Sequence, residues 1–330
     1  MDERPAGGKK NFWLAAGAVA ATYAYFLLFA EFAFLELVAR AAPGASSLRA
    51  AMGALGAGGI AGSFVGLWRF TPERFMLRLR LSYGGCAVAA ILAARAGGPG
   101  MLVLVAAVIG LMLGWNTVTL ATGLRSLLPV NRLGLGAGVG TGMAYALGNV
   151  PAIFTAGPRL QTWIVAGIAV LAALGLGGAQ PAWPATEAGP RPVWRWVAAF
   201  LGLVGFDSAV FYVLQHTPAL RDATWSGAAN LWGLASVHLV VALIAGRWLD
   251  GGWFRRLVGI AGGLLVMASL GLRVMPLPAL GFVYAAGVSV YSAALVWFAA
   301  RDGRPWVAVA VFAIAGWVGS ALGIGLVQGG

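Results

Sequence analysis

The sequence predicts an all-α polytopic membrane protein that crosses the bilayer about eleven times. Sixty per cent of its 330 residues are hydrophobic and 10% are charged, whereas a soluble domain carries roughly 25% charged residues. Uninterrupted apolar runs such as 12–39 and 305–327 exceed the roughly 20 residues that a helix needs to cross a bilayer. A membrane β-barrel would show alternating segments of about 10 residues instead, so we expect the runs to be helices.

Charged or Gly/Pro-rich breaks separate these apolar runs into two sets. Between the sets, the stretch from Gly178 to Pro192 is proline-rich and resembles a linker. We expect an N-terminal six-helix half (1–178), a cytoplasmic linker (179–192) and a C-terminal five-helix half (193–330), and a twelfth helix stays possible. The predicted helices cover 12–39, 48–68, 79–96, 100–123, 133–156, 160–178, 193–215, 226–247, 255–273, 276–299 and 305–327.

The distribution of basic residues predicts the orientation in the membrane. With a cytoplasmic N-terminus, most of the 22 Lys and Arg residues lie on the cytoplasmic side, where membrane proteins concentrate their cations. The exceptions are Arg40, Arg49, Arg95, Arg159, Arg221 and Arg273. We therefore expect a multi-pass protein of the bacterial inner (plasma) membrane. The net charge of +12 is spread between apolar runs, so no nucleic-acid partner is expected.

A glycine- and arginine-rich segment, GRWLDGGWFRR, follows the eighth run. Gly246 permits close helix contact, and Asp250 can cap a helix N-terminus or pair with an arginine. Arg255 and Arg256 can hold the loop against anionic lipid headgroups. An ordinary cytoplasmic loop would also explain these residues. The counterpart after the second run, residues 66–74, keeps the glycine and the basic residues but lacks the aspartate.

This segment resembles the loop signature that the major facilitator superfamily carries between helices 2 and 3 and repeats between helices 8 and 9. An offset of 180 residues pairs Gly66 with Gly246, and an offset of 176 pairs Trp115 with Tyr291. Such pairs are expected of parallel repeats. The resemblance implies a two-half helical bundle and a secondary active transporter that moves a small solute by alternating access.

Two acids inside apolar runs are candidates for proton coupling. A charged side chain within the bilayer is costly and needs a partner, water or a proton. Asp207 lies near the middle of the seventh run, and Glu31 lies in the outer half of the first. With the 180-residue offset, Glu31 falls one helical turn from the position that matches Asp207. Protons are therefore expected partners, although a purely structural carboxyl group would also explain each acid.

Other polar and aromatic residues of the runs are candidates for lining a solute cavity, and ordinary helix packing is the alternative for each. His238 could relay protons or bind a metal, and a hydrogen-bonded core histidine explains it as well. A lone Cys86 and two separated histidines give no cofactor or metal motif, so we expect no enzyme. The cavity candidates are Trp115, Asn116, Thr119, Ser208, Tyr212, Gln215, His238, Tyr291 and Ser292.

Nothing in these residues identifies the solute. A second hypothesis also stays open, because the loop after the second run lacks its aspartate and a twelfth helix is not evident. In that hypothesis the chain is a membrane partner or assembly factor with a degenerate facilitator fold that transports nothing.

Overall fold

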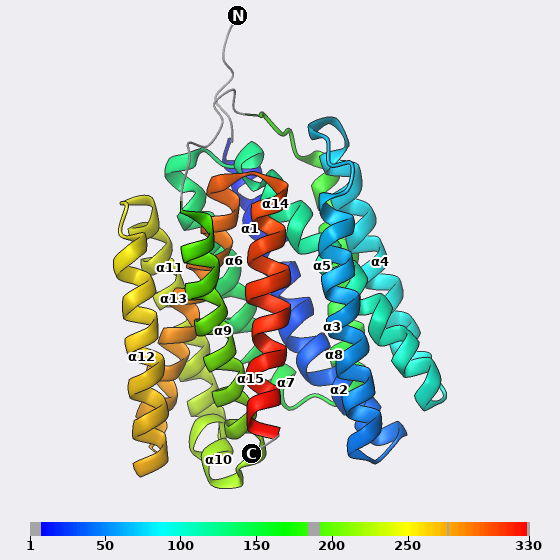
Figure 1. The fold of residues 1–330 in the computed structure, drawn as a ribbon, viewed down its shortest axis with the longest axis vertical. Helices are drawn as coiled ribbons and strands as arrows, with labels where there is room; N and C mark the ends of the chain where they lie inside the picture. The colour runs from blue at the N-terminus through cyan, green and yellow to red at the C-terminus, as the bar shows by residue number, and fades with distance from the viewer. Residues whose placement is uncertain (1–7, 184–191, 276, 329–330) are drawn as a thin grey trace, which may run out of the picture.

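The structure is a computed structural model and describes residues 8–183, 192–275 and 277–328. These residues form helices and short connections, with no strand among them. The long helices run along the longest axis of the molecule (Figure 1). Helix α1 begins at one end of this axis and α15 ends at the other, and we call these the N-terminal end and the C-terminal end of the bundle.

Ten helical segments of the described chain are long and apolar enough to cross a membrane. The predicted all-α membrane fold is therefore confirmed, and most predicted helices lie within a few residues of the observed ones. The helices of these ten segments are α1 (Lys9–Ala24) with α2 (Phe34–Ala41), α3 (Ala45–Leu67), α4 (Phe75–Arg95), α5 (Pro99–Leu127), α8 (Pro158–Gly175), α9 (Val193–His216), α11 (Ala228–Asp250), α12 (Phe254–Val274), α13 (Pro278–Asp302), and α14 (Pro305–Val309) with α15 (Gly319–Gln328).

The predicted helix 133–156 is wrong in one respect, because the structure interrupts it. Helix α6 (Leu133–Gly148) has 16 residues and is followed by the short α7 (Pro151–Phe154). Proline disfavours helical geometry in the residue before it, and Val150 is extended, with φ −64° and ψ 122°. The fifth of the eleven predicted spans is thus a broken helix.

The first and last spans each contain a π-helical segment in their middle, Tyr25–Ala33 and Ala310–Val318. The two segments touch, since the rings of Phe26 and Trp317 pack edge to face with their centroids 6.2 Å apart. π-Helical turns are rare and often occur at functional sites. Neither segment was expected, because both have the composition of ordinary apolar helix.

Glycines bring two pairs of helices into backbone contact. A Cβ at Gly62 of α3 would lie 2.1 Å from the Leu111 carbonyl oxygen of α5, and a Cβ at Gly138 of α6 would lie 2.2 Å from the Ala242 carbonyl oxygen of α11. Small residues let membrane helices approach this closely. Contacts between α6 and α11 join segments that lie far apart in the sequence.

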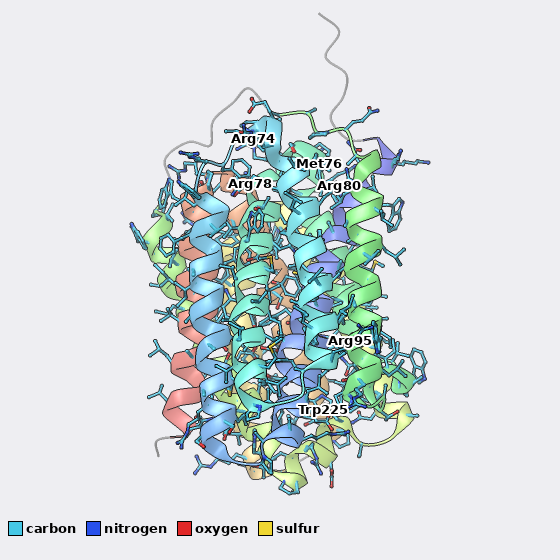
Figure 2. The ribbon with its side chains drawn as sticks, turned by 90° about the vertical axis from the view of Figure 1, so that its right-hand side faces the viewer. Arg74, Met76, Arg78, Arg80, Arg95 and Trp225 are labelled. Carbon is cyan, nitrogen blue, oxygen red and sulfur yellow. The ribbon has the colours of Figure 1, made fainter. Side chains whose placement is uncertain are left out.

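Arginines gather at the N-terminal end of the bundle on the face that Figure 2 presents. Arg74, Arg78 and Arg80 lie near this end, whereas Arg95 lies toward the opposite end. The Arg78 guanidinium donates to the carbonyl oxygens of Val65 at 2.6 Å and Trp68 at 3.0 Å. It therefore satisfies carbonyl groups that the end of α3 leaves without helical partners.

Candidate functional site

Asp207 of α9 accepts hydrogen bonds from two tyrosines of α13. The Tyr284 hydroxyl donates to Oδ1 and the Tyr291 hydroxyl donates to Oδ2, each at 2.5 Å. Residues seven apart lie nearly above one another on a helix, so α13 directs both hydroxyls to the same side. A carboxyl group within a bilayer needs partners, and here both of its oxygens have one.

Glu31 and Tyr145 extend this arrangement to the first and fifth spans. Glu31, in the π-helical segment Tyr25–Ala33, lies near enough to Asp207 for the two carboxyl groups to interact electrostatically. Tyr145 of α6 lies near both acids and near Tyr23 of α1, and the two tyrosine rings are 6.2 Å apart. We call Glu31, Asp207, Tyr23, Tyr145, Tyr284 and Tyr291 the acid–tyrosine cluster.

Ser292 of α13 holds two of these tyrosines in place. Its hydroxyl lies 3.0 Å from the Tyr145 hydroxyl, and its carbonyl oxygen accepts from the Tyr23 hydroxyl at 3.4 Å. Ser292 itself is buried. The cluster therefore links α1, α6 and α9 to α13 through hydroxyl groups and the Asp207 carboxylate.

His238 of α11 lies beside the cluster. Its ring stacks on Tyr145 with centroids 4.6 Å apart and an interplanar angle of 9°, and Nδ1 lies 2.8 Å from the Ser289 hydroxyl. Since that hydroxyl donates to the Ala285 carbonyl oxygen at 2.9 Å, it accepts from His238, which places the ring hydrogen on Nδ1. In the described part of the chain, no three His, Cys, Asp or Glu side chains lie together as metal ligands.

Asn116 belongs to a second, buried polar network between α1, α4 and α5. Its amide nitrogen donates to the Thr22 hydroxyl at 3.0 Å, and its amide oxygen accepts from Ser82 at 2.9 Å. Thr22 also bonds the Tyr83 hydroxyl at 2.8 Å. Both ends of the Asn116 amide thus take part in contacts between helices.

Trp115 and Thr119, the other two candidates on α5, have no described contact with the acid–tyrosine cluster. The Arg78 guanidinium lies 5.8 Å from the Trp115 ring centroid. The Trp115 indole nitrogen and the Thr119 hydroxyl are buried and have no hydrogen-bond partner.

The candidates that follow Asp207 on α9 make local or peripheral contacts. Ser208 donates to the Ser320 hydroxyl of α15 at 3.0 Å. The Tyr212 ring stacks on His216 with centroids 4.0 Å apart, and Gln215 is half-buried. The structure therefore does not gather the polar residues of α9 around one cavity.

Asp250 caps α6 from the end of α11. Its two carboxylate oxygens accept from the backbone N–H groups of Gly134 at 2.6 Å and Leu135 at 2.9 Å. A Cβ at Gly246, one turn earlier, would lie 2.5 Å from the Gly134 carbonyl oxygen. Both loop candidates thus hold α6 against α11, whereas Arg255 and Arg256 line a cavity at the start of α12.

Sequence reasoning missed Tyr23, Tyr145 and Ser289. Each is an uncharged residue in an apolar run, and none shows a spacing that points to a partner. The seven-residue spacing of Tyr284 and Tyr291 is visible in the sequence, and it puts both hydroxyls on one side of a helix.

The arrangement of helices is similar to that of two solved transporter structures. The human organic anion transporter MFSD10 (TETRAN) superposes with a TM-score of 0.70 at 14% sequence identity, covering 96% of this chain and 92% of that chain. FucP, a major facilitator superfamily transporter in the outward conformation, superposes with a TM-score of 0.66 at 14% identity, covering 96% and 90%. No family profile and no curated protein sequence matches the chain.

These comparisons define the fold class. The chain is a multi-pass membrane protein with the fold of major facilitator superfamily transporters. The fold that the loop signature implied is confirmed.

Proposed function

We propose that the chain is a secondary active transporter that moves a small solute by alternating access and couples this movement to protons. The observation that supports this function best is the Asp207 carboxylate held by two tyrosine hydroxyls, with Glu31 near enough to interact with it electrostatically. Transporters of this kind place substrate and coupling ions where their repeats meet inside the membrane. Two acids from the first and seventh spans, with tyrosines from the fifth and tenth, supply such a site.

Proton binding at Asp207 would change the contacts between α9 and α13. The charged carboxylate only accepts hydrogen bonds, and both tyrosine hydroxyls donate to it. A protonated carboxyl group also donates, so one tyrosine has to turn away or accept. A proton on either acid would also remove the repulsion between Asp207 and Glu31. The protonation state would thereby be linked to how the helices pack.

The charges of the cluster favour a neutral or cationic solute over an anion. Both described hydrogen-bond partners of the Asp207 carboxylate are tyrosine hydroxyls, which carry no positive charge. The hydroxyls of Tyr23, Tyr284 and Tyr291 already donate within the protein, so their oxygen atoms can accept from a hydroxylated or amine-bearing solute. This site therefore differs from what an organic anion, the substrate named for the human neighbour, would require.

The test is thermal unfolding of the purified protein in detergent, at two pH values, with panels of polyols and sugars, quaternary and primary amines, and organic acids. A ligand that binds only the folded state at 100 times its Kd stabilises it by about 2.7 kcal/mol. We expect stabilisation by polyols or amines. This stabilisation should be lost in Asp207→Asn and in Glu31→Gln.

Two substitutions of exposed acids serve as matched controls. Glu36→Gln changes the exposed partner of Arg40 in the same span as Glu31, and Asp222→Asn changes an exposed acid of α10 (Pro218–Trp225). Both should respond to ligands like the unchanged protein. If no compound stabilises any variant, the proposal of a transporter gives way to that of a membrane partner. Stabilisation by organic acids alone would refute the proposed solute class.

A further inference from the structure

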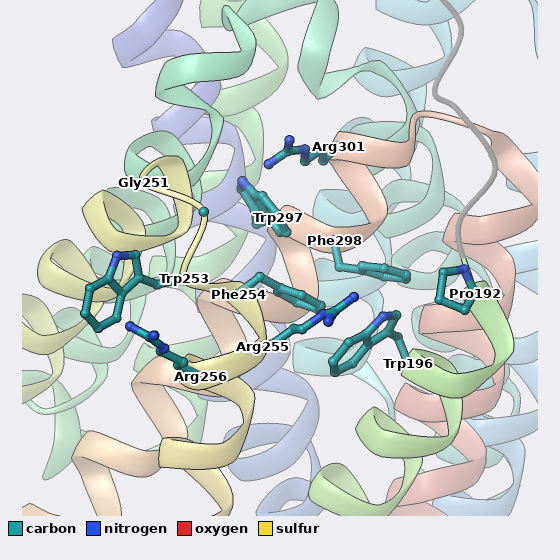
Figure 3. Close-up of a pocket in the computed structure, with 11 residues that line it drawn as sticks. Pro192, Trp196, Gly251, Trp253, Phe254, Arg255, Arg256, Trp297, Phe298 and Arg301 are labelled. Atoms are coloured by element: carbon teal, nitrogen blue, oxygen red, sulfur yellow. The ribbon is translucent and has the colours of Figure 1, made fainter.

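A cavity of about 560 Å³ lies at the N-terminal end of the bundle, between the beginnings of α9 and α12 and the end of α13. Figure 3 shows aromatic side chains from all three helices around it, and Trp196, Phe254 and Trp297 are among them. Its volume falls within the range of small-molecule sites, roughly 300–1,000 Å³. The cavity does not involve any residue of the acid–tyrosine cluster.

Three arginines give this cavity a strong positive charge. Arg255, Arg256 and Arg301 all line it. The Arg256 guanidinium lies 4.5 Å from the Trp253 ring centroid, and the Arg301 guanidinium lies 4.8 Å from that of Trp297. Stacking on an aromatic ring orients the planar guanidinium group, whose N–H groups match the oxygen atoms of an anion.

Two sets of N–H groups at the cavity have no acceptor among the residues that the structure describes. The indole nitrogen of Trp297 has no hydrogen-bond partner although the side chain is only 4% exposed, and in Figure 3 it points toward the side of Gly251 and Arg301. Buried polar groups normally have partners. Helix α12 begins at Phe254, so the N–H groups of its first turn also lie here, where a helix favours an anion.

One carboxylate close to the cavity offsets part of its positive charge. Asp250 interacts electrostatically with Arg247 and Arg301, but both of its oxygens already accept from the start of α6. The cavity thus combines guanidinium groups, an unpartnered indole N–H and a helix N-terminus with aromatic walls. An anion with several oxygen acceptors and an apolar portion matches this combination.

We propose that the cavity binds the phosphate group of an anionic phospholipid from the leaflet at the N-terminal end. Guanidinium groups match phosphate oxygens with paired hydrogen bonds, and the aromatic walls suit the glycerol and the first methylene groups. Helices α9 and α12 pack mainly on α15 and α13 and little on each other. Trp194 of α9 and Ile260 of α12 are exposed apolar side chains near the cavity, so lipid lies beside it when the bundle spans a membrane.

The experiment is native mass spectrometry of the delipidated protein in detergent, titrated in parallel with phosphatidylglycerol, phosphatidylcholine, glycerol 3-phosphate and inorganic phosphate. We expect one tightly retained phosphatidylglycerol and weaker retention of phosphatidylcholine. The double variant Arg255→Gln/Arg256→Gln should bind phosphatidylglycerol roughly 30-fold more weakly, from the contribution of each arginine near an anionic headgroup. The control Arg159→Gln/Arg273→Gln, which removes two exposed arginines at the start of α8 and the end of α12, should bind like the unchanged protein.

Trp297→Phe provides a second test that keeps the aromatic wall and removes only the indole N–H. We expect Trp297→Phe to bind phosphatidylglycerol several-fold more weakly. If the double arginine variant does not fold, this variant alone tests whether the cavity binds the lipid. Equal retention of the two lipids, or unchanged binding in the arginine variant and in Trp297→Phe, would overturn the proposal. Glycerol 3-phosphate or inorganic phosphate binding as tightly as phosphatidylglycerol would overturn the assignment to a lipid.

Discussion

The buried pair of His238 and Ser289 joins α11 to α13 next to the acid–tyrosine cluster. Removing the serine hydroxyl leaves the Nδ1–H of a buried imidazole without an acceptor, which costs about 1–3 kcal/mol. We therefore expect Ser289→Ala to lower the midpoint of thermal unfolding in detergent. Ser236→Ala is the control, because the Ser236 hydroxyl is exposed and donates only to the Trp232 carbonyl of its own helix. Equal effects of the two substitutions would contradict the interhelical role of Ser289.

The bond between Asp207 and Tyr291 is open to a double-mutant cycle. Asp207→Asn and Tyr291→Phe each remove part of the same hydrogen bond, so their effects on stability should not add. Contacting residues show interaction energies of about 0.5–3 kcal/mol. We expect a coupling in this range from unfolding in detergent. A cycle of Asp207→Asn with Tyr212→Phe, whose ring stacks on His216 instead, should give a coupling near zero.

At the scale of single residues, the sequence could identify the two acids within the membrane spans but not the tyrosines that lie beside them. A charge in an apolar run is conspicuous because it is costly, so Asp207 and Glu31 stand out. Tyr23 and Tyr145 do not, since a tyrosine in a membrane helix equally serves packing. Which tyrosines meet an acid depends on how α1, α6, α9 and α13 are arranged, and that arrangement is set by contacts between distant segments.

Among the elements, the close packing of α6 against α11 depends on glycines, which have no side chain at the contact. A Cβ at Gly246 would lie 2.5 Å from the Gly134 carbonyl oxygen, so Gly246→Ala should force the helices apart at a cost of about 1–3 kcal/mol. Gly259→Ala on α12 is the matched control, because a Cβ there meets nothing within 4 Å. We expect Gly246→Ala to unfold at a lower temperature and Gly259→Ala to be neutral or slightly stabilised. The reverse order would show that the close approach is not required.

Helix bounds were largely predictable because each depends on local signals. Charged loops and the prolines that begin α5, α8 and α13 mark ends that any reader of the sequence can see. The break before Pro151 was visible as a proline but was not expected to end α6, since the apolar run continues past it. The π-helical segments have the composition of ordinary apolar helix, so only tertiary packing distinguishes them.

For the whole molecule, we propose that residues 1–178 and 193–330 form two halves that rock against each other. The proposed linker 179–192 includes residues 184–191, which lie outside the described residues. Contacts of α6 with α11, and of α3 with segment 310–318, join the two proposed halves. The Asp250 cap and the contact of Gly246 with Gly134 lie in the first of these joints, so opening the N-terminal end would have to break them.

The orientation in the membrane can be tested on the intact protein, because its one cysteine, Cys86, is 1% exposed and should not react. We expect Arg74→Cys to react with a membrane-impermeant maleimide only from the cytoplasmic side. Arg159→Cys, at the start of α8 and on the side that the predicted topology places outside, should react only from the opposite side. Labelling of both from the same side would refute the predicted alternation, and the reverse pattern would place the N-terminus outside.

The π-helical segments Tyr25–Ala33 and Ala310–Val318 also affect how freely the first and last spans can turn. A π-helical hydrogen bond joins residues five apart, so such a segment holds a surplus residue compared with an α-helix. Moving that surplus along the span rotates the residues that it passes, while the two ends of the span stay in place and most hydrogen bonds are kept. We expect amide hydrogen exchange within both segments to be faster than in the flanking α-helical turns, and uniform protection along the two spans would contradict this. The Glu31 side chain could then point in a different direction although both ends of its helix stay in place.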